Sequence, residues 1–247
     1  MSDRAPQRTL LLTGASRGIG HATARLFHDE GWRVITVSRQ AFSPRCPWGG
    51  AEDHVQLDLG DIDRLGEGLA DIRRRLADGR LDALVNNAGI SPKAPNGGRL
   101  GVLETAYETW ISVFNVNLFS TALLAKGLIR ELSAAKGSIV NVTSIAGSRV
   151  HPYAGVAYAS SKAALASLTR EMAAEFAPLG VRTNAISPGE IDTSILSPGT
   201  AAFAEREVPM RRLGKPSEVA SAIYFLCNAA ASYVNGAELH INGGQHV

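Results

Sequence analysis

Short runs of β-branched and apolar residues alternate with longer helical patterns along the whole of this 247-residue chain. Between the runs, apolar residues recur at three- and four-residue spacing, most clearly in Leu103–Leu132 and Ala157–Phe176. This alternation predicts an α/β fold, a single-domain Rossmann-type doubly wound parallel sheet of about seven strands with helices on both faces. The expected strands are Thr9–Thr13, Arg33–Ser38, His54–Leu57, Ala83–Val85, Gly137–Val142, Val181–Ile186 and Ala237–Ile241.

Composition and charge narrow the class of protein. Hydrophobic residues make up 45% of the chain, and 25 basic against 23 acidic side chains leave a net charge of +2. This balance gives no electrostatic case for nucleic acid or an anionic membrane as the main partner. Cys46 and Cys227 lie too far apart for a metal or redox motif, and we identify no run of about 18 apolar residues. We therefore expect a cytoplasmic protein of one domain, residues 1–247, with no metal site.

A glycine-rich turn follows the first expected strand. The segment Thr13–Gly20 reads TGASRGIG and opens a helix at about Gly18. Glycines let the backbone turn tightly and approach a pyrophosphate, and the helix N-terminus offers it free N–H groups and a partial positive charge. Its position between strand and helix predicts a dinucleotide site, although its glycine spacing differs from the common GxGxxG.

Several further motifs follow in order along the chain. They are Asn86-Asn87-Ala88-Gly89 after the fourth strand, Asn117, Ser144, the pair Tyr158 and Lys162, and Pro188-Gly189 after the sixth strand. Together with the glycine turn they resemble the short-chain dehydrogenase/reductase family over nearly the whole chain, from about Leu10 to Gly244. The C-terminal half, with Pro209–Gly214 and Asn242–Gly244, is most similar to bacterial 3-oxoacyl-acyl-carrier-protein reductases. The resemblance implies an oxidoreductase that uses a nicotinamide cofactor.

The end of the second strand predicts which nicotinamide cofactor binds. An acidic residue there favours NAD, whereas a nearby Arg accommodates the 2′-phosphate of NADP. In this chain Ser38 stands where the acid would be, with Arg39 next to it and Arg17 in the glycine turn. An Arg guanidinium matches phosphate oxygens well, so NADP is favoured over NAD.

The resemblance extends the cofactor site along the sheet. It implies that Asp58 contacts the adenine and that Ile191 and Thr193 hold the carboxamide. A turn-capping role explains Thr193 equally well. The expected cofactor-binding residues are Gly14, Ser16, Arg17, Gly18, Ile19, Gly20, Ser38, Arg39, Asp58, Leu59, Asn87, Ala88, Gly89, Tyr158, Lys162, Pro188, Gly189, Ile191 and Thr193.

The expected catalytic residues are Tyr158, Lys162, Ser144 and Asn117. Tyr158 and Lys162 are four residues apart in a helical pattern and so share one face. A lysine ammonium nearby favours the phenolate, which a tyrosine with a pKa of about 10 does not reach alone. Ser144, after the fifth strand, is placed to polarise a substrate carbonyl. The resemblance gives Asn117, rather than Asn115, the role of holding a water in a proton relay to Lys162.

We therefore predict NADPH-dependent reduction of a ketone, either a 3-oxoacyl thioester or a small carbonyl compound, to the secondary alcohol, with Tyr158 as the proton donor. An NAD(P)-linked sugar or polyol dehydrogenase is an alternative within the same enzyme class. A non-catalytic dinucleotide-binding sensor is an alternative from another class, but the catalytic group is complete.

Residues on the substrate side carry weaker expectations. His151 is either a second polar contact to the substrate or, as most loop histidines are, exposed and idle. Glu190 either binds a cationic or polyhydroxylated substrate or points to water. Carrier-protein-dependent members of the family place basic residues before strands five and six, where this chain has only Lys136. An acyl carrier protein is therefore a weakly supported partner.

Two longer segments complete the expectations. Gln40–Asp53 is rich in Pro, Gly and Ser and is a poor helix candidate, in which Pro47 and Trp48 either pack over the adenine side or only fill the loop. The resemblance makes Leu103–Leu132, with Ala157–Phe176, an interface helix of a homotetramer. The sequence itself supports only apolar faces that need covering.

Overall fold

The computed structural model describes residues 7–43, 48–76, 78–194, 196–197 and 199–247. Seven strands in this part of the chain form one parallel sheet in the order β3-β2-β1-β4-β5-β6-β7. Their bounds are β1 Thr9–Thr13, β2 Arg33–Ser38, β3 His54–Gln56, β4 Ala83–Asn86, β5 Ser138–Val142, β6 Arg182–Pro188 and β7 Glu238–Ile241. The predicted Rossmann-type sheet is confirmed, with strand ends that differ from the expected ones by at most two residues.

The strand order places a switch point beside β1. Leu11 of β1 pairs with Ile35 of β2 on one side and with Leu84 of β4 on the other. The chain runs from β1 outward to β3 and then returns to start the other half of the sheet at β4. The connections after β1 and β4 therefore leave the sheet in different directions, which opens a crevice at their carboxyl ends.

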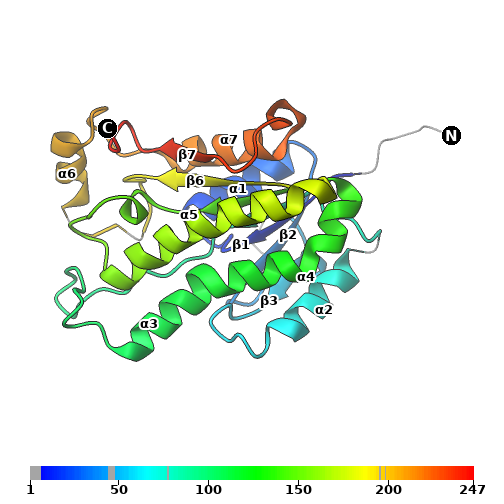
Figure 1. Cartoon of the computed structure of the whole chain (residues 1–247), viewed down its shortest axis with the longest axis horizontal. Helices are drawn as coiled ribbons and strands as arrows, with labels where there is room; N and C mark the ends of the chain where they lie inside the picture. The colour runs from blue at the N-terminus through cyan, green and yellow to red at the C-terminus, as the bar shows by residue number, and fades with distance from the viewer. Residues whose placement is uncertain (1–6, 44–47, 77, 195, 198) are drawn as a thin grey trace.

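Helices cover both faces of the sheet (Figure 1). Alternate residues of β1 point to opposite faces: Leu10 and Leu12 join a core with α1 and α7, whereas Leu11 joins a core with α2, α4 and α5. Both cores are rich in fully buried aliphatic side chains, as expected for a parallel sheet covered on both sides. The helices are α1 Gly18–Asp29, α2 Leu65–Arg75, α3 Tyr107–Phe114, α4 Ser120–Ala135, α5 Val156–Phe176, α6 Thr200–Glu207 and α7 Pro216–Cys227.

The expected helix Leu103–Leu132 differs in its start and in its middle. It begins only at Tyr107, after a turn in which Leu103 is 96% exposed, and a π-helical segment, η2 Asn115–Phe119, joins α3 to α4. The resulting 29-residue run Tyr107–Ala135 is, by length and composition only, long and apolar enough to cross a membrane, and an 18-residue window within it has a mean hydropathy of 1.3. The expectation that the chain contains no segment of this length and apolarity is therefore wrong. Leu124 and Leu128, on its inner face, belong to the core.

The segment 40–53 is irregular, as expected, apart from a 3₁₀ turn, η1 Ala51–Asp53. Trp48 is buried and belongs to the core on the α1 side of the sheet, where its ring meets His21 at a centroid distance of 4.4 Å. Trp48 thus packs on α1 and is more than loop filler. Cys227 is buried at the end of α7. Pro47 and Cys46 lie outside the described residues.

Candidate active site

The glycine turn between β1 and α1 has no room for side chains at its key positions. Gly14 and Gly18 have positive φ angles of 72° and 57°. A Cβ atom at Gly20 would lie 2.1 Å from the Gly14 carbonyl oxygen. Glycine is therefore required here for both backbone conformation and close approach.

The N-terminus of α1 fits a bound phosphate. Its N-cap, Arg17, has an extended backbone and makes no side-chain capping hydrogen bond, and the first turn of the helix holds no acidic residue. The first N–H groups of the helix are thus left without a side-chain acceptor, and the helix dipole adds a partial positive charge there. An uncapped helix end beside a glycine turn is the arrangement that holds a dinucleotide pyrophosphate.

The segment after β4 holds this turn in place. Thr13 Oγ1 accepts hydrogen bonds from the backbone N–H groups of Asn87 and Ala88, both at 3.0 Å. The Asn87 side chain donates to the carbonyl oxygens of Thr13 and Gly14, also at 3.0 Å. These four bonds couple the carboxyl ends of β1 and β4. Asn87 was predicted to bind the cofactor. These bonds give it a structural role as well, because they fix the shape of the phosphate-binding turn.

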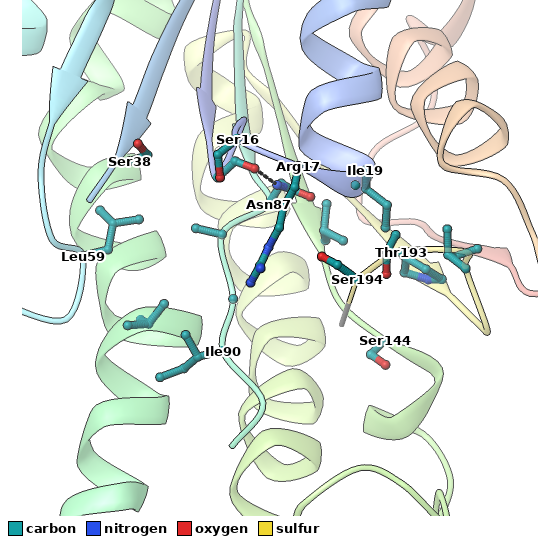
Figure 2. A pocket seen from close by; sticks show the side chains of 18 of the residues that line it. Ser16, Arg17, Ile19, Ser38, Leu59, Asn87, Ile90, Ser144, Thr193 and Ser194 are labelled. Atoms are coloured by element: carbon teal, nitrogen blue, oxygen red, sulfur yellow. Dashed lines mark hydrogen bonds between the residues drawn. The ribbon is translucent and has the colours of Figure 1, made fainter. Parts of the chain in front are cut away.

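A cleft of about 660 Å³ runs along these strand ends. All the predicted cofactor-binding residues line it except Gly20, which is buried inside the turn. Ser144 also lines the cleft, so the predicted catalytic serine and the cofactor residues share one cavity. Figure 2 shows the Arg17 side chain extending from the glycine turn into this space.

The adenosine end of the cleft carries two unpaired cations. Arg17 and Arg39 are exposed, and neither guanidinium has a hydrogen-bond or ion-pair partner among the described residues. Ser38 also lines the cleft and donates its hydroxyl to the Gln40 carbonyl oxygen at 3.1 Å. Asp58 faces the same end, where its side chain accepts a hydrogen bond from Gly60 N–H at 2.9 Å.

The other end of the cleft is closed by α5 and the end of β5. Tyr158 and Lys162 lie on one face of α5, and the Lys162 ammonium nitrogen is 5.7 Å from the Tyr158 ring centroid. Lys162 is 3% exposed and donates to the Val142 carbonyl oxygen at 2.6 Å. Ser144 begins the 3₁₀ turn η3 Ile145–Gly147 and faces the cleft. The structure thus brings together the predicted tyrosine, lysine and serine.

Burial sets the protonation states of this group. Burial raises the pKa of the Tyr158 phenol, the Ser144 side chain acts in the opposite sense, and the charge of Glu190 raises it further. Burial lowers the pKa of Lys162 to about 8. At neutral pH the phenol therefore keeps its proton, and Lys162 is still mostly an ammonium.

Asn117 lies in the π-helical segment η2 and is 1% exposed. Its amide accepts from Ile90 N–H at 2.9 Å and donates to the Ile90 carbonyl oxygen at 3.1 Å and to Ser161 Oγ at 3.0 Å. The side chain therefore fastens the loop after β4 to α5, close to Lys162. Such π-helical bulges occur often at functional sites. Its role in a water relay stays a prediction.

The segment after β6 crosses the nicotinamide end. Pro188, Gly189, Ile191 and Thr193 line the cleft, and the Thr193 methyl group would be 3.0 Å from a Cβ atom at Gly18. Thr193 thus faces the glycine turn. A turn is also present, because the Thr193 carbonyl oxygen accepts from Leu196 N–H at 3.2 Å, but it uses the backbone and not the hydroxyl.

Two substrate-side residues differ from expectation. His151 is 8% exposed and Glu190 is 7% exposed, and the His151 Nε2 atom bonds to Glu190 Oε1. The expectation of an exposed, idle histidine is wrong, and so is the option that Glu190 points to water. Both residues were singled out from the sequence, but their contact was not predicted, because nothing in the sequence indicates that positions 39 residues apart meet.

Two other cleft residues were not singled out from the sequence. Val116 and Thr143 line the cleft beside predicted positions. Val116 and Thr143 directly precede Asn117 and Ser144 in the chain. Adjacency to a predicted catalytic residue was the one signal available for them.

Comparison with known proteins identifies the family. A family model described as Enoyl-(Acyl carrier protein) reductase matches residues 14–246. Protein FixR of Bradyrhizobium diazoefficiens is 60% identical over 247 residues, covering 99% of this chain and 89% of that protein. Cis-4-hydroxycyclohexanecarboxylate dehydrogenase of Sinomonas cyclohexanicum is 39% identical, covering 99% and 98%. The 3-oxoacyl-[acyl-carrier-protein] reductase FabG of Thermotoga maritima is 35% identical, covering 98% of each chain.

A solved structure agrees with these relatives. The crystal structure of a short-chain dehydrogenase/reductase family oxidoreductase from Brucella ovis, in complex with partially ordered NAD, is 57% identical to this chain. It has a TM-score of 0.84 and covers 96% of this chain and 100% of that one. The predicted resemblance is confirmed: the chain belongs to the short-chain dehydrogenase/reductase family and is an NAD(P)-dependent oxidoreductase that acts on carbonyl or alcohol groups.

Proposed function

We propose that this protein reduces a ketone to the secondary alcohol with NADPH, with Tyr158 as the proton donor. One observation carries the proposal: the Tyr158 phenol and the Ser144 hydroxyl lie at one end of a cleft whose other end is built for a dinucleotide. The raised pKa of Tyr158 supports reduction, because a phenol that keeps its proton at neutral pH is ready to give it to a developing alkoxide.

The residues divide the chemistry between them. When bound, the nicotinamide supplies the hydride. Ser144 and Tyr158 offer two O–H donors to the carbonyl oxygen, where negative charge develops, and such donors stabilise the charge most in a partly dry site. Lys162, fixed by the Val142 carbonyl oxygen, places a positive charge near the phenol ring and favours the phenolate that remains after proton transfer.

The preference for NADPH is supported by the free cations. Arg17 and Arg39 are placed at the adenosine end with no carboxylate at the end of β2, and a 2′-phosphate would pair with them. The Brucella ovis relative was solved with NAD, so the cofactor is a point for measurement. We expect kcat/KM for NADPH to exceed that for NADH by about tenfold or more. This is the gain expected from one or two charge-assisted hydrogen bonds between the arginines and the 2′-phosphate.

A substrate panel with the purified protein tests the proposal. Oxidation of NADPH and NADH is followed with acetoacetyl thioester, small diketones and keto-sugars as acceptors. The proposal predicts turnover of at least one ketone and its loss in Tyr158→Phe. Full activity in Tyr158→Phe, or NADPH binding without turnover of any ketone, would favour a non-catalytic sensor and refute it.

Two features bear on the alternatives. A sugar or polyol dehydrogenase is the second candidate, because the ligand-free structure of Thermoplasma acidophilum aldohexose dehydrogenase is 32% identical to this chain, with a TM-score of 0.83. The turns before β5 and β6 lie side by side, with Lys136 against Gly180, and offer one cation there. This is a thin basic surface for an acidic carrier protein, so a small carbonyl compound is the better-supported substrate.

We propose the homotetramer for the assembly and the cytoplasm for the location. Large apolar side chains are exposed along the α3–α4 run, where Tyr107 is 71%, Ile111 40% and Phe119 44% exposed. Exposed large apolar side chains along one helical run favour burial against another copy. Light scattering coupled to size-exclusion chromatography should give four times the 26.1 kDa chain mass. A monomer at micromolar concentration would contradict this assembly.

A further inference from the structure

The strongest unexplained feature is a set of polar side chains on one face of the sheet edge that β2 and β3 form. Thr36 of β2 pairs with His54 of β3. Two residues further on, Ser38 pairs with Gln56, so all four side chains point to the same face. Val55, between the two polar residues of β3, points to the opposite face and is 1% exposed. The sheet edge therefore presents polar groups on one face only.

Three of these side chains bond to the backbone of the loop that follows β2. His54 Nε2 lies 2.8 Å from the Gln40 carbonyl oxygen. A carbonyl oxygen can only accept, so Nε2 carries the hydrogen and is the donor. Gln56 Nε2 donates to the Arg39 carbonyl oxygen at 3.1 Å, and Ser38 Oγ gives Gln40 a second donor at 3.1 Å. Side chains from β2 and β3 therefore fix two consecutive carbonyl groups, those of residues 39 and 40.

The imidazole of His54 is itself held in place. Its Nδ1 atom forms a hydrogen bond with Thr36 Oγ1 of the neighbouring strand at 2.8 Å. The Phe42 ring lies against it, at a centroid distance of 6.2 Å. His54 thus connects two points of one segment, Thr36 within β2 and Gln40 after it. Because both ring nitrogens are bonded, the imidazole cannot turn without losing two hydrogen bonds.

The segment that His54 and Gln56 hold belongs to the cofactor cleft. Arg39 and Gln40 both line it. The Arg39 guanidinium has no partner in the part of the chain that the structure describes, so its own side-chain contacts do not direct it into the cleft. Its position therefore depends on the backbone from which it starts. A long side chain binds a ligand at a lower entropic cost when that backbone is already fixed.

We propose that His54 and Gln56 are positioning residues for the selection of NADPH over NADH. By holding the carbonyl groups of Gln40 and Arg39, they keep the Arg39 guanidinium within reach of the 2′-phosphate. This inference rests on the proposed preference for NADPH. NADH lacks this phosphate, so loss of the two hydrogen bonds weakens NADPH binding much more than NADH binding.

The ratio of two dissociation constants tests the proposal. The Kd for NADH divided by that for NADPH, measured by the fluorescence of each bound cofactor, reports the preference without any substrate. His54→Phe keeps a ring and removes both hydrogen bonds, and it should lower the ratio about 3- to 10-fold. Gln56→Ala removes one bond and should lower it about 2- to 5-fold. His54→Gln, which keeps an N–H donor of similar reach, should retain most of the wild-type ratio.

A double substitution shows whether the effect passes through Arg39. In Arg39→Ala the guanidinium is absent, so His54 has no cation left to position. His54→Phe should therefore leave the ratio at the value of Arg39→Ala alone, although it lowers the ratio in the wild-type chain. Such non-additivity is expected when two residues contribute to one interaction.

Two matched controls change similar residues away from the cleft. Gln7 Nε2 donates to the Gly31 carbonyl oxygen at 3.1 Å, so Gln7→Ala removes a bond of the same kind and length as Gln56→Ala does. His28 is an exposed histidine of α1, and His28→Phe matches His54→Phe. Neither Gln7 nor His28 lines the cleft, and both variants should keep the wild-type ratio.

The possible outcomes are distinct. An unchanged ratio in the His54 and Gln56 variants, including an equal rise of both dissociation constants, would overturn the proposal and leave the NADPH preference intact. A fall that persists in the Arg39→Ala background would also overturn it, because the effect would not pass through the guanidinium. If His54→Phe does not fold, Gln56→Ala decides, since Gln56 is exposed. If the wild type binds NADPH no more tightly than NADH, the NADPH preference fails, and this inference fails with it.

Discussion

Replacing Lys162 by Met should change how the stability of the protein depends on pH. Lys162 is 3% exposed, and burial lowers its pKa from 10.5 to about 8. Below pH 8 the folded and unfolded states both carry the proton, so the full cost of the buried charge is present. Between pH 8 and 10.5 the unfolded chain binds one more proton, and the free energy of unfolding rises by about 1.4 kcal/mol per pH unit.

The difference in unfolding free energy between wild type and Lys162→Met isolates the titration of Lys162, because the contributions of the other titratable groups are the same in both proteins and cancel. From pH 7 to pH 9.5 the difference should move by about 2 kcal/mol in favour of the wild type. At this chain length that corresponds to roughly 4–8 °C in the difference of melting temperatures. Thermal unfolding of the cofactor-free proteins at matched concentrations measures it. A difference that stays constant across this range would refute a pKa of about 8.

Other predictions concern the reaction and the cofactor. Tyr158→Phe should lower reduction by about 10²- to 10⁴-fold while NADPH still binds, with a far smaller change in its dissociation constant; equal loss of both would point to misfolding. In the wild type, alcohol oxidation should rise with pH above neutrality as the buried phenol loses its proton, whereas reduction should not, as initial rates will show. Arg39→Ala should raise KM for NADPH about tenfold more than that for NADH, with Arg25→Ala as the exposed control; equal effects would exclude a phosphate contact. Gly20→Ala should abolish dinucleotide binding in titrations, because its Cβ would lie 2.1 Å from a carbonyl oxygen, whereas Gly66→Ala, with nothing within 4 Å, should not.

Much of the fold could be predicted from the sequence because its signals are local. Strand–helix alternation fixes a parallel sheet, and the glycine turn marks the end of β1, where the strand order switches. The helix start at Tyr107 was missed because Leu103 has helical spacing but lies in a turn, with its side chain exposed. Periodicity reports an apolar face and does not report which residues reach the sheet.

The candidate site likewise contains some residues that could be predicted from the sequence and others that could not. Residues that act through a backbone shape or along one helix, such as Gly14 or the pair Tyr158 and Lys162, are readable because their partners are near in sequence. The contact between His151 and Glu190 arises from packing of the loop after η3 on the segment after β6. No local rule indicates it, and a lone loop histidine or glutamate is exposed in most proteins.

The charges of the cleft give its two ends different tasks. At the adenosine end, two exposed arginines without partners in the described chain favour the binding of an anionic ligand. At the catalytic end, burial keeps the Tyr158 proton in place and lowers the pKa of Lys162 to about 8, and the anion of Glu190 acts on Tyr158 in the same direction as burial. Before substrate binds, the protein's own groups therefore favour the protonated phenol. That state is the one a reductase needs, and an alcohol dehydrogenase working at neutral pH would have to overcome it.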